Sequence, residues 1–102
     1  IDTNTVIAAQ TGVSGSTKIG KNVMIGGQAG LAGHLAIADG IKIAGGAGVT
    51  KTFTTANMTI AGFPAADQKQ SLRSQVYVKN LPELAKRVQE LEILVQQLSQ
   101  KA

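Results

Sequence analysis

Aliphatic residues recur every six positions through the first half of the chain. These nine positions, called rungs below, are Ile1, Ile7, Val13, Ile19, Ile25, Leu31, Ile37, Ile43 and Val49. An amphipathic helix needs a spacing near 3.6 and a half-buried strand needs a spacing of 2, so neither element explains the pattern. A fixed six-residue repeat with β-branched rungs is typical of a parallel β-helix.

The repeat predicts an all-β solenoid over residues 1–54, built from nine hexads in three triangular coils. Each coil is short and is expected to be stabilised mostly by its neighbours. The position four after each rung can add a second inward contact. The position two after it is often small, and we expect a tight corner that favours glycine there. The small residues at that position are Ala9, Gly15, Gly27, Gly33 and Gly45.

The six-residue period breaks over residues 55–64, where Gly62 and Pro64 predict an exit loop. Residues 65–102 have a helical composition and predict a C-terminal helical extension. Asn80 is a candidate helix cap, and Pro82 suits the first turn of the helix that follows. The last helix is expected over roughly residues 81–101.

The last helix carries apolar residues at alternating spacings of three and four, which is the pattern of a coiled-coil seam. The seam residues are Leu81, Leu84, Val88, Leu91, Val95 and Leu98. The seam is too short to hold an isolated coiled coil, so we expect it to work together with contacts between solenoids. A triangular prism and a heptad seam both accommodate threefold packing, and the pattern therefore favours a homotrimer.

Composition excludes several classes of function. Aromatic residues are only 3% of the chain, and a formal net charge of +4 is too weak to indicate nucleic-acid binding. The chain has no cysteine, so disulfides and thiolate metal sites are excluded. No apolar run approaches a membrane span, which predicts a soluble cytoplasmic protein. Ile1 is already in phase with the rungs, and we expect the chain to be the C-terminal piece of a longer protein.

Few side chains offer chemistry. His34 is the only histidine, and its interpretation as a surface residue at a subunit contact stands beside a functional one. One histidine cannot make a three-histidine metal site, so we expect no metal. Asp2 and Asp39 are far apart in the repeat and indicate no acid–base pair. Ser14 and Ser16 occupy a corner, where short polar side chains bond their own backbone.

The motifs together resemble a known family. The run IAAQTGVSGSTKIGKNVMIGGQAGLAGHLAI, followed by AGFPA, LRSQ and a terminal helix, resembles the hexapeptide-repeat acyltransferases. Within them it is most similar to the UDP-3-O-acylglucosamine N-acyltransferases of lipid A biosynthesis. The resemblance implies a left-handed parallel β-helix of hexapeptide repeats followed by C-terminal α-helices, in a trimer. General crossover rules favour the right hand, so the left hand rests on the resemblance.

The resemblance also implies a reaction. A 3-hydroxyacyl chain would move from the phosphopantetheine of acyl carrier protein to the 2-amino group of a UDP-3-O-acylglucosamine, with no other cofactor. The family's catalytic histidine, the general base, precedes the repeat and is absent from this chain, as is the family's substrate-binding N-terminal domain. The whole protein is therefore expected to be an enzyme, whereas this chain alone is expected to be inactive.

Three positions match the family's site motifs. The Gly15 N–H, in the corner Ser14-Gly15-Ser16, matches the donor that holds the oxyanion. His34 matches a residue that supports binding of substrate phosphate or pantetheine. Gly48 falls where a side chain sets acyl-chain length, so the resemblance implies an open groove and a longer acyl chain. A corner glycine is the alternative interpretation of Gly48.

A basic surface for the acidic carrier protein is the remaining expectation, with solvated surface side chains as the alternative. Its expected members are Lys51, Lys69, Arg73 and Lys79. Ser71 stands where the family tends to have Trp, which predicts looser packing of the first C-terminal helix. Two alternative functions stay open: a CoA- or carrier-dependent hexapeptide acetyltransferase or O-acyltransferase, and a non-catalytic trimeric β-helix scaffold.

Overall fold

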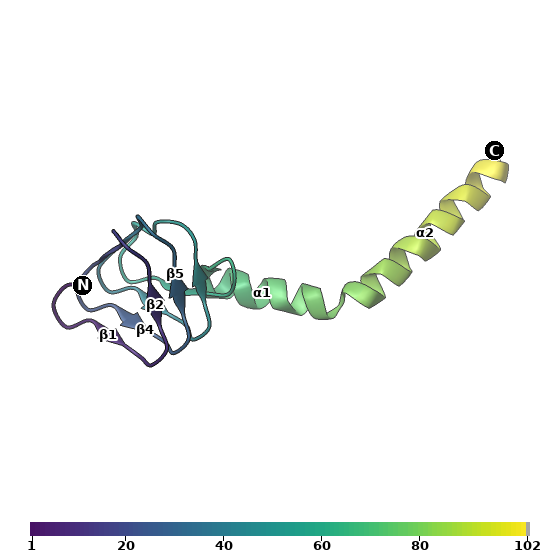
Figure 1. The fold of residues 1–102 in the computed structure, drawn as a ribbon. Helices are drawn as coiled ribbons and strands as arrows, with labels where there is room; N and C mark the ends of the chain where they lie inside the picture. Colours follow the sequence, from purple (N-terminus) through teal and green to yellow (C-terminus); the bar gives the residue numbers. More distant parts are fainter. Residues whose placement is uncertain (102) are drawn as a thin grey trace. The chain divides into compact units, whose positions relative to one another are not determined.

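The first part of the chain is a parallel β-solenoid in the computed structural model, which describes residues 1–101 (Figure 1). The chain divides into two compact units, Ile1–Ser71 and Leu72–Ala102, called the solenoid unit and the helical unit. Strands of the solenoid pair in parallel with the strand three hexads later, as Ile7 does with Ile25. Three hexads therefore close one coil, and this prediction is confirmed.

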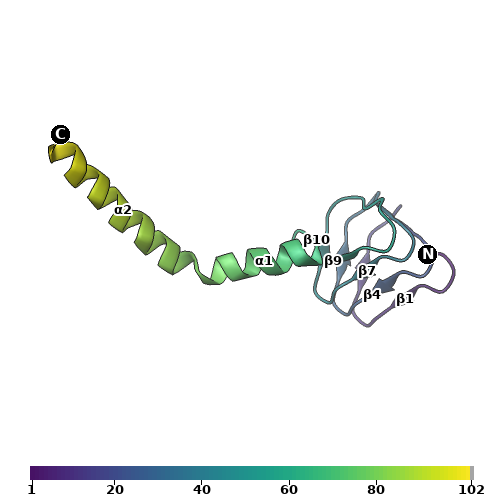
Figure 2. The same ribbon diagram turned by 180° about the vertical axis from the view of Figure 1, so that it is seen from behind.

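Eight two-residue strands, each ending on a rung, form three faces of the solenoid. The first sheet has the order β1 (Val6–Ile7), β4 (Met24–Ile25), β7 (Lys42–Ile43), β9 (Thr59–Ala61) and β10 (Ala66–Asp67), seen side by side in Figure 2. The second contains β2 (Gly12–Val13), β5 (Gly30–Leu31) and β8 (Gly48–Val49). The third contains β3 (Lys18–Ile19) and β6 (Ala36–Ile37).

The core runs down the middle of the coils. Rungs from the second coil onward are buried, and the predicted second inward position is confirmed by Val23 and Ile41, whose side chains are fully enclosed. In the first coil this position holds threonine, and Thr17 Oγ1 donates a 2.7 Å hydrogen bond to the Ala32 carbonyl oxygen of the next coil. The first rung, Ile1, is 77% exposed because no coil packs on that side in the structure.

The corners differ from the sequence expectation in one respect. The residue with positive φ is the third after each of the first eight rungs, as in Ser16 and His34 (φ 62° in both), not the second. The small second residue has another cause, because coils stack there: a Cβ on Gly33 would lie 3.2 Å from the Gly15 carbonyl oxygen. Glycine at this position therefore reflects close approach of backbones and not turn conformation.

The solenoid continues beyond residue 54. Phe53 bridges to Ile37, and Ile60 pairs with Ile43, at separations slightly shorter than three hexads. Strand β9 therefore lies inside 55–64, where the lost six-residue period predicts an exit loop. Strand β10 then turns back and pairs antiparallel with β9. This antiparallel strand covers the edge on which another coil would stack.

Two helices follow, α1 (Gln68–Lys79) and α2 (Leu81–Lys101), and the second begins and ends where the sequence predicts. The Asn80 carbonyl oxygen accepts a 2.9 Å hydrogen bond from Leu84 N–H, as a capping residue does. Ser71 is buried, and its Oγ donates a 2.6 Å hydrogen bond to the Ala61 carbonyl oxygen. This hydrogen bond anchors the start of α1, whereas the serine at this position predicts looser packing of the helix. Neither helix, as described through residue 101, is long and apolar enough to cross a membrane.

Candidate functional site

A shallow groove lies on the outer face of the β2-β5-β8 sheet. Its floor is a column of glycines, because Gly12 pairs with Gly30 and Gly30 pairs with Gly48. Successive residues of a strand point to opposite faces, so these glycines leave the outer face bare while the rungs beside them point inward. The groove has a volume of about 440 Å³. Its lining residues are Gly12, Val13, Ser14, Gly30, Leu31, Gly48, Val49, Thr50 and Phe63.

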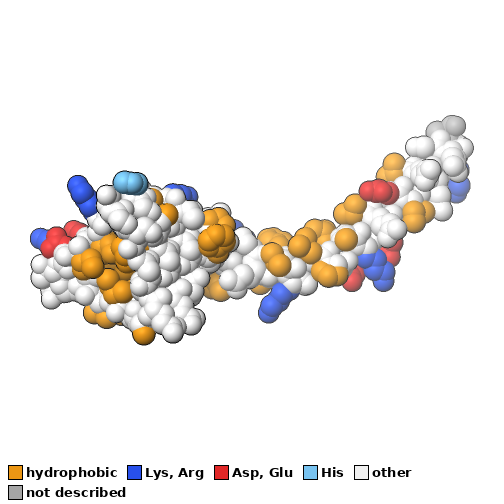
Figure 3. Space-filling view, viewed as in Figure 1, with side chains coloured by type: hydrophobic (Ala, Val, Ile, Leu, Met, Phe, Trp, Pro, Cys, Tyr) orange, Lys and Arg blue, Asp and Glu red, His pale blue; other side chains and the backbone are white. Residues whose placement is uncertain are grey.

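The predicted site residues Gly15 and His34 meet at one edge of this sheet. Gly15 lies in the corner after β2, and His34 lies in the corner after β5. The carboxyl ends of parallel strands share an edge, and the His34 N–H donates a 3.1 Å hydrogen bond to the Gly15 carbonyl oxygen. The His34 side chain is exposed and is visible in pale blue on the surface in Figure 3.

The Gly15 amide is open to an incoming group. Gly15 is exposed, and a Cβ added to it would meet no atom within 4 Å. Across residues 1–101 we find no acceptor for its N–H group. An exposed, unpaired amide in a corner fixed by backbone hydrogen bonds can donate to a negatively charged oxygen.

Gly48 lies within strand β8 and not at a corner, so the corner interpretation of this glycine is wrong. The resemblance alone implies an open groove at this position, but in the structure the groove is closed at this end. The ring of Phe63 occupies the space that a Cβ on Gly48 would take, with Phe63 Cγ 3.1 Å from that position. Sequence reasoning missed Phe63 because it lies in the segment where the six-residue period is lost.

The four predicted basic residues come from both units of the chain. Lys51 follows β8 and so lies at the same sheet edge as Gly15 and His34, with its Nζ 5.4 Å from the centroid of the Phe53 ring. Lys69 lies in the first turn of α1, where its N–H donates a 3.2 Å hydrogen bond to Asp67 Oδ2. Arg73 and Lys79 belong to the helical unit. Within the solenoid unit, Lys51 therefore lies at the edge formed by Gly15 and His34.

The two carboxylates of the coils lie at another corner, beyond the third sheet. Asp39 Oδ1 accepts a 2.7 Å hydrogen bond from Lys21 N–H. Asp2 Oδ1 accepts hydrogen bonds from the Thr3 N–H at 2.7 Å and the Thr3 hydroxyl at 3.1 Å. The backbone hydrogen bond from Thr3, with help from its hydroxyl, lowers the pKa of Asp2 below its ordinary value. Within residues 1–101 no group of three His, Asp or Glu side chains could hold a metal ion.

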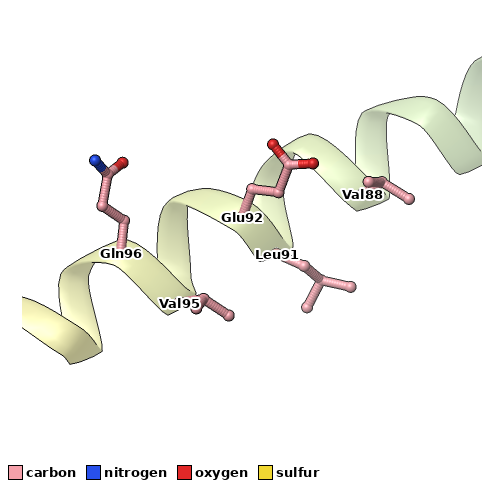
Figure 4. Close-up of a pocket in the computed structure, with 5 residues that line it drawn as sticks. All are labelled: Val88, Leu91, Glu92, Val95 and Gln96. Carbon is pink, nitrogen blue, oxygen red and sulfur yellow. The ribbon is translucent and has the colours of Figure 1, made fainter.

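A second apolar surface follows the predicted seam of α2. In Figure 4, Val88, Leu91 and Val95 project to one side of the helix, and Glu92 and Gln96 project to another. No described residue of α2 is buried, and Leu91 is 56% exposed. Among residues 72–101 no other side chain buries this seam.

Comparison with known proteins confirms the predicted resemblance. No family model matches the sequence. The chain is 59% identical over 92 residues to a UDP-3-O-acylglucosamine N-acyltransferase from Cytophaga hutchinsonii, and the match covers 90% of this chain. It covers 26% of that relative, so the chain spans about a quarter of the relative's length.

Two solved structures are also similar. The acetyltransferase domain of PglB from Neisseria gonorrhoeae FA1090 shares 28% identity and a TM-score of 0.59 over 62% of this chain and 30% of that one. A maltose O-acetyltransferase from Clostridium difficile 630 shares 35% identity and a TM-score of 0.48 over 50% of this chain and 27% of that one. The likeness to the PglB domain supports the left-handed β-helix that the resemblance implies.

Proposed function

We propose that this chain is part of an N-acyltransferase that transfers a 3-hydroxyacyl chain from acyl carrier protein to the 2-amino group of a UDP-3-O-acylglucosamine. The similarity to a UDP-3-O-acylglucosamine N-acyltransferase supports this reaction. The observation that carries the proposal is the hydrogen bond between the corners of Gly15 and His34, at the edge of the glycine-floored groove. At this edge a free amide, an imidazole and the apolar groove lie close together.

The chemistry follows from these groups. The sugar amine attacks the thioester carbonyl carbon, a C–N bond forms, and the carbonyl oxygen becomes an oxyanion. The open Gly15 N–H donates to that oxyanion, which is worth on the order of 3 kcal/mol to the transition state. The C–S bond then breaks, and the phosphopantetheine sulfur leaves and takes up a proton.

A general base must take the proton from the attacking amine. His34 is the only histidine of this chain, and we assign it to binding of substrate phosphate or pantetheine. The base therefore comes from another part of the protein, and the chain alone is expected to be inactive. Lys51, at the same edge, adds positive charge for an acidic carrier protein or a phosphate. The wider carrier surface that we propose consists of Lys51, Lys69, Arg73 and Lys79.

A trimer completes the proposal. The unpartnered seam of α2 has heptad spacing, and three copies would cover it while the solenoids pack side by side. We expect Leu91→Asn, within the seam, to reduce the molar mass measured by light scattering from three chains toward one. Ile93→Asn is the matched control, because Ile93 is similarly exposed (50%) but lies off the seam. Equal masses for the two variants would contradict a trimer held by this seam.

The decisive experiment is an acyl-transfer assay on the full-length protein that carries this sequence. We expect transfer from 3-hydroxyacyl carrier protein to UDP-3-O-acylglucosamine, detected by mass spectrometry of the product. Gly15→Pro removes only the amide donor, because proline suits the position before a residue with positive φ. It should lower kcat about 100-fold or more, as loss of an oxyanion donor does.

Gly27→Pro is the matched control, at the same hexad position in a different corner, and should leave kcat close to that of the wild type. His34→Ala should instead raise KM for a substrate more than it lowers kcat. Equal losses of kcat in Gly15→Pro and Gly27→Pro would contradict the proposed oxyanion donor.

Acetyl transfer from CoA is the second candidate, favoured by the structural likeness to an acetyltransferase domain. The same assay separates the two, because an acetyltransferase would transfer acetyl groups from acetyl-CoA and leave the hydroxyacyl carrier protein unused. A scaffold without catalysis would form the trimer and transfer neither group.

A further inference from the structure

Two charged residues border the apolar seam of α2 on opposite sides. In the heptad notation a to g, the seam residues Val88 and Leu91 occupy positions a and d. Arg87 then occupies position g, on one side of the seam, and Glu92 occupies position e, on the other side. Glu92 lines the same surface as Val88 and Leu91 (Figure 4). Both charged side chains are exposed, so they border the face that a second helix would cover.

The spacing of these two residues suits a parallel neighbour. In a parallel, in-register coiled coil, position g of one helix faces position e of the next heptad on its neighbour, which lies five residues further along. The residue five positions after Arg87 is Glu92. Each Arg87 guanidinium would therefore meet the Glu92 carboxylate of the neighbouring helix at the border of the seam. This contact recurs between neighbouring helices in a dimer and in a trimer.

An antiparallel neighbour would not bring these charges together. In an antiparallel pair, position g faces position g and position e faces position e. With the two seams fully overlapped, Arg87 would face Leu94 and Glu92 would face Ala85. Neither charged side chain would then meet an opposite charge. The charges at the border of the seam therefore favour the parallel arrangement.

Contacts within one helix account for Arg87 but not for Glu92. Glu83 precedes Arg87 by four residues, a spacing that allows an ion pair within one helix, and both line a shallow cavity of about 330 Å³ at the start of α2. The residues three and four positions away from Glu92, on either side, are valines and glutamines. Glu92 thus has no opposite charge at a helical spacing, which leaves its carboxylate beside the seam available to another chain.

We propose that Arg87 of one chain forms an ion pair with Glu92 of a neighbouring copy, and that this pair sets the associated α2 helices parallel and in register. The inference rests on the proposed self-association of the seam and does not depend on acyl transfer. The apolar seam supplies most of the affinity between helices, whereas complementary charges at its border select the orientation and the register.

The test detects the proximity of two α2 helices through an interchain disulfide. This chain has no cysteine, so Leu98→Cys, in the full-length protein made otherwise free of cysteine, places one thiol in the seam of each helix. In a parallel, in-register pair the two thiols face each other, and a disulfide can form because its Cα atoms must lie within about 7 Å. In an antiparallel pair with overlapped seams, the two positions lie about 26 Å apart. Non-reducing gel electrophoresis measures the rate of disulfide formation.

Charge reversal in the Leu98→Cys background tests the ion pair itself. Arg87→Glu and Glu92→Arg each place like charges at the border of the seam and should slow disulfide formation roughly 5-fold or more at low salt. The combined variant restores opposite charges, and its rate should return close to that of Leu98→Cys alone. The losses should disappear in about 1 M salt, where the Debye length is about 3 Å. Lys86→Glu and Glu90→Arg are the matched controls, because they make the same charge changes away from the seam and should keep the rate.

The outcomes separate this inference from the proposals above. If Leu98→Cys forms no interchain disulfide, both the trimer held by this seam and the ion pair are contradicted. If the disulfide forms but the reversals of Arg87 and Glu92 behave like their controls, or the combined variant does not recover, this inference alone is overturned. Recovery in the combined variant at low salt would support the pair, whether light scattering gives the mass of two chains or of three.

Discussion

The two units of the chain bury their apolar side chains very differently. In the solenoid unit the inward side chains of Val23, Ile41 and Ile60 are fully enclosed by neighbouring coils. In the helical unit every described residue is exposed, including all members of the α2 seam. The solenoid unit therefore supplies its own core, whereas the helical unit leaves its apolar face uncovered within itself.

This difference follows from how each element repeats. Each coil contacts the next over all three faces, so each added coil adds burial to the last. The 21-residue helix α2 has no buried residue, and isolated helices are only marginally stable in water. Substitutions in the solenoid unit should therefore change the stability of the single chain. Substitutions in the seam should act through association.

The largest expected effect is a core truncation. Ile41→Ala should lower the free energy of unfolding by about 2–5 kcal/mol, because it leaves a cavity among fully buried side chains. Leu91→Ala, at a 56% exposed position, should leave the dissociated chain within about 0.5 kcal/mol of the wild type. Urea denaturation at a concentration where the chain is dissociated measures both. Similar losses would show that α2 is buried in the single chain and that the two units do not differ in this way.

The next effect tests close packing between coils. A Cβ on Gly26 would lie 2.8 Å from Gly45 Cα, so Gly26→Ala must push two backbones apart. We expect a loss of about 1–3 kcal/mol, as in other overpacked interiors. Gly12→Ala is the control, since a Cβ there meets no atom within 4 Å. Thermal unfolding should separate the two variants, and equal melting temperatures would mean that the coils can separate freely.

The sequence predicts these coils well because their signal is strictly periodic. One buried rung in every hexad, with strand pairing at every third hexad, leaves little choice of register for Ile25 or Ile43. The final helix is equally clear, since Asn80 and Pro82 mark its start. These elements are encoded by residues close together or regularly spaced, so a linear pattern is enough to find them.

The closed end of the groove could not be predicted in this way. Ile60 pairs with Ile43 at a separation that is not a whole number of hexads, so counting by six loses Ile60. The position of Phe63 depends on hydrogen bonds that join the irregular segment around it to Gly48 of the third coil. The six-residue period predicts that the site glycines and His34 lie on one face of the solenoid. It does not predict which residue fills the space over Gly48.

A smaller effect separates corner conformation from packing. Gly46 has φ of +72°, and a Cβ there meets no atom within 4 Å. Gly46→Ala should therefore cost only the strain of a left-handed backbone, about 1–2 kcal/mol. Gly46→Asn should cost less, because asparagine tolerates this region better and Asn22 already adopts it at another corner. If the two variants unfold at the same urea concentration, the corner does not require this conformation.

The smallest effect concerns Asp2, in the least buried coil. Its carboxylate accepts two hydrogen bonds from Thr3, and the pKa of Asp2 is lowered from its ordinary value of 3.8. A depressed pKa means that the carboxylate stabilises the folded chain above pH 3.8, and that this contribution is lost as the pH falls through the lowered pKa. Asp2→Asn should thus be slightly less stable than the wild type near pH 7 and equal to it at strongly acidic pH. Urea denaturation at both pH values measures the difference, and a deficit that grows on acidification would reverse the assigned sign. Because Asp2 is fully exposed, its substitution should change the free energy of unfolding much less than substitution of any buried rung does. Exposed residues of the solenoid unit should thus contribute less to stability than enclosed ones.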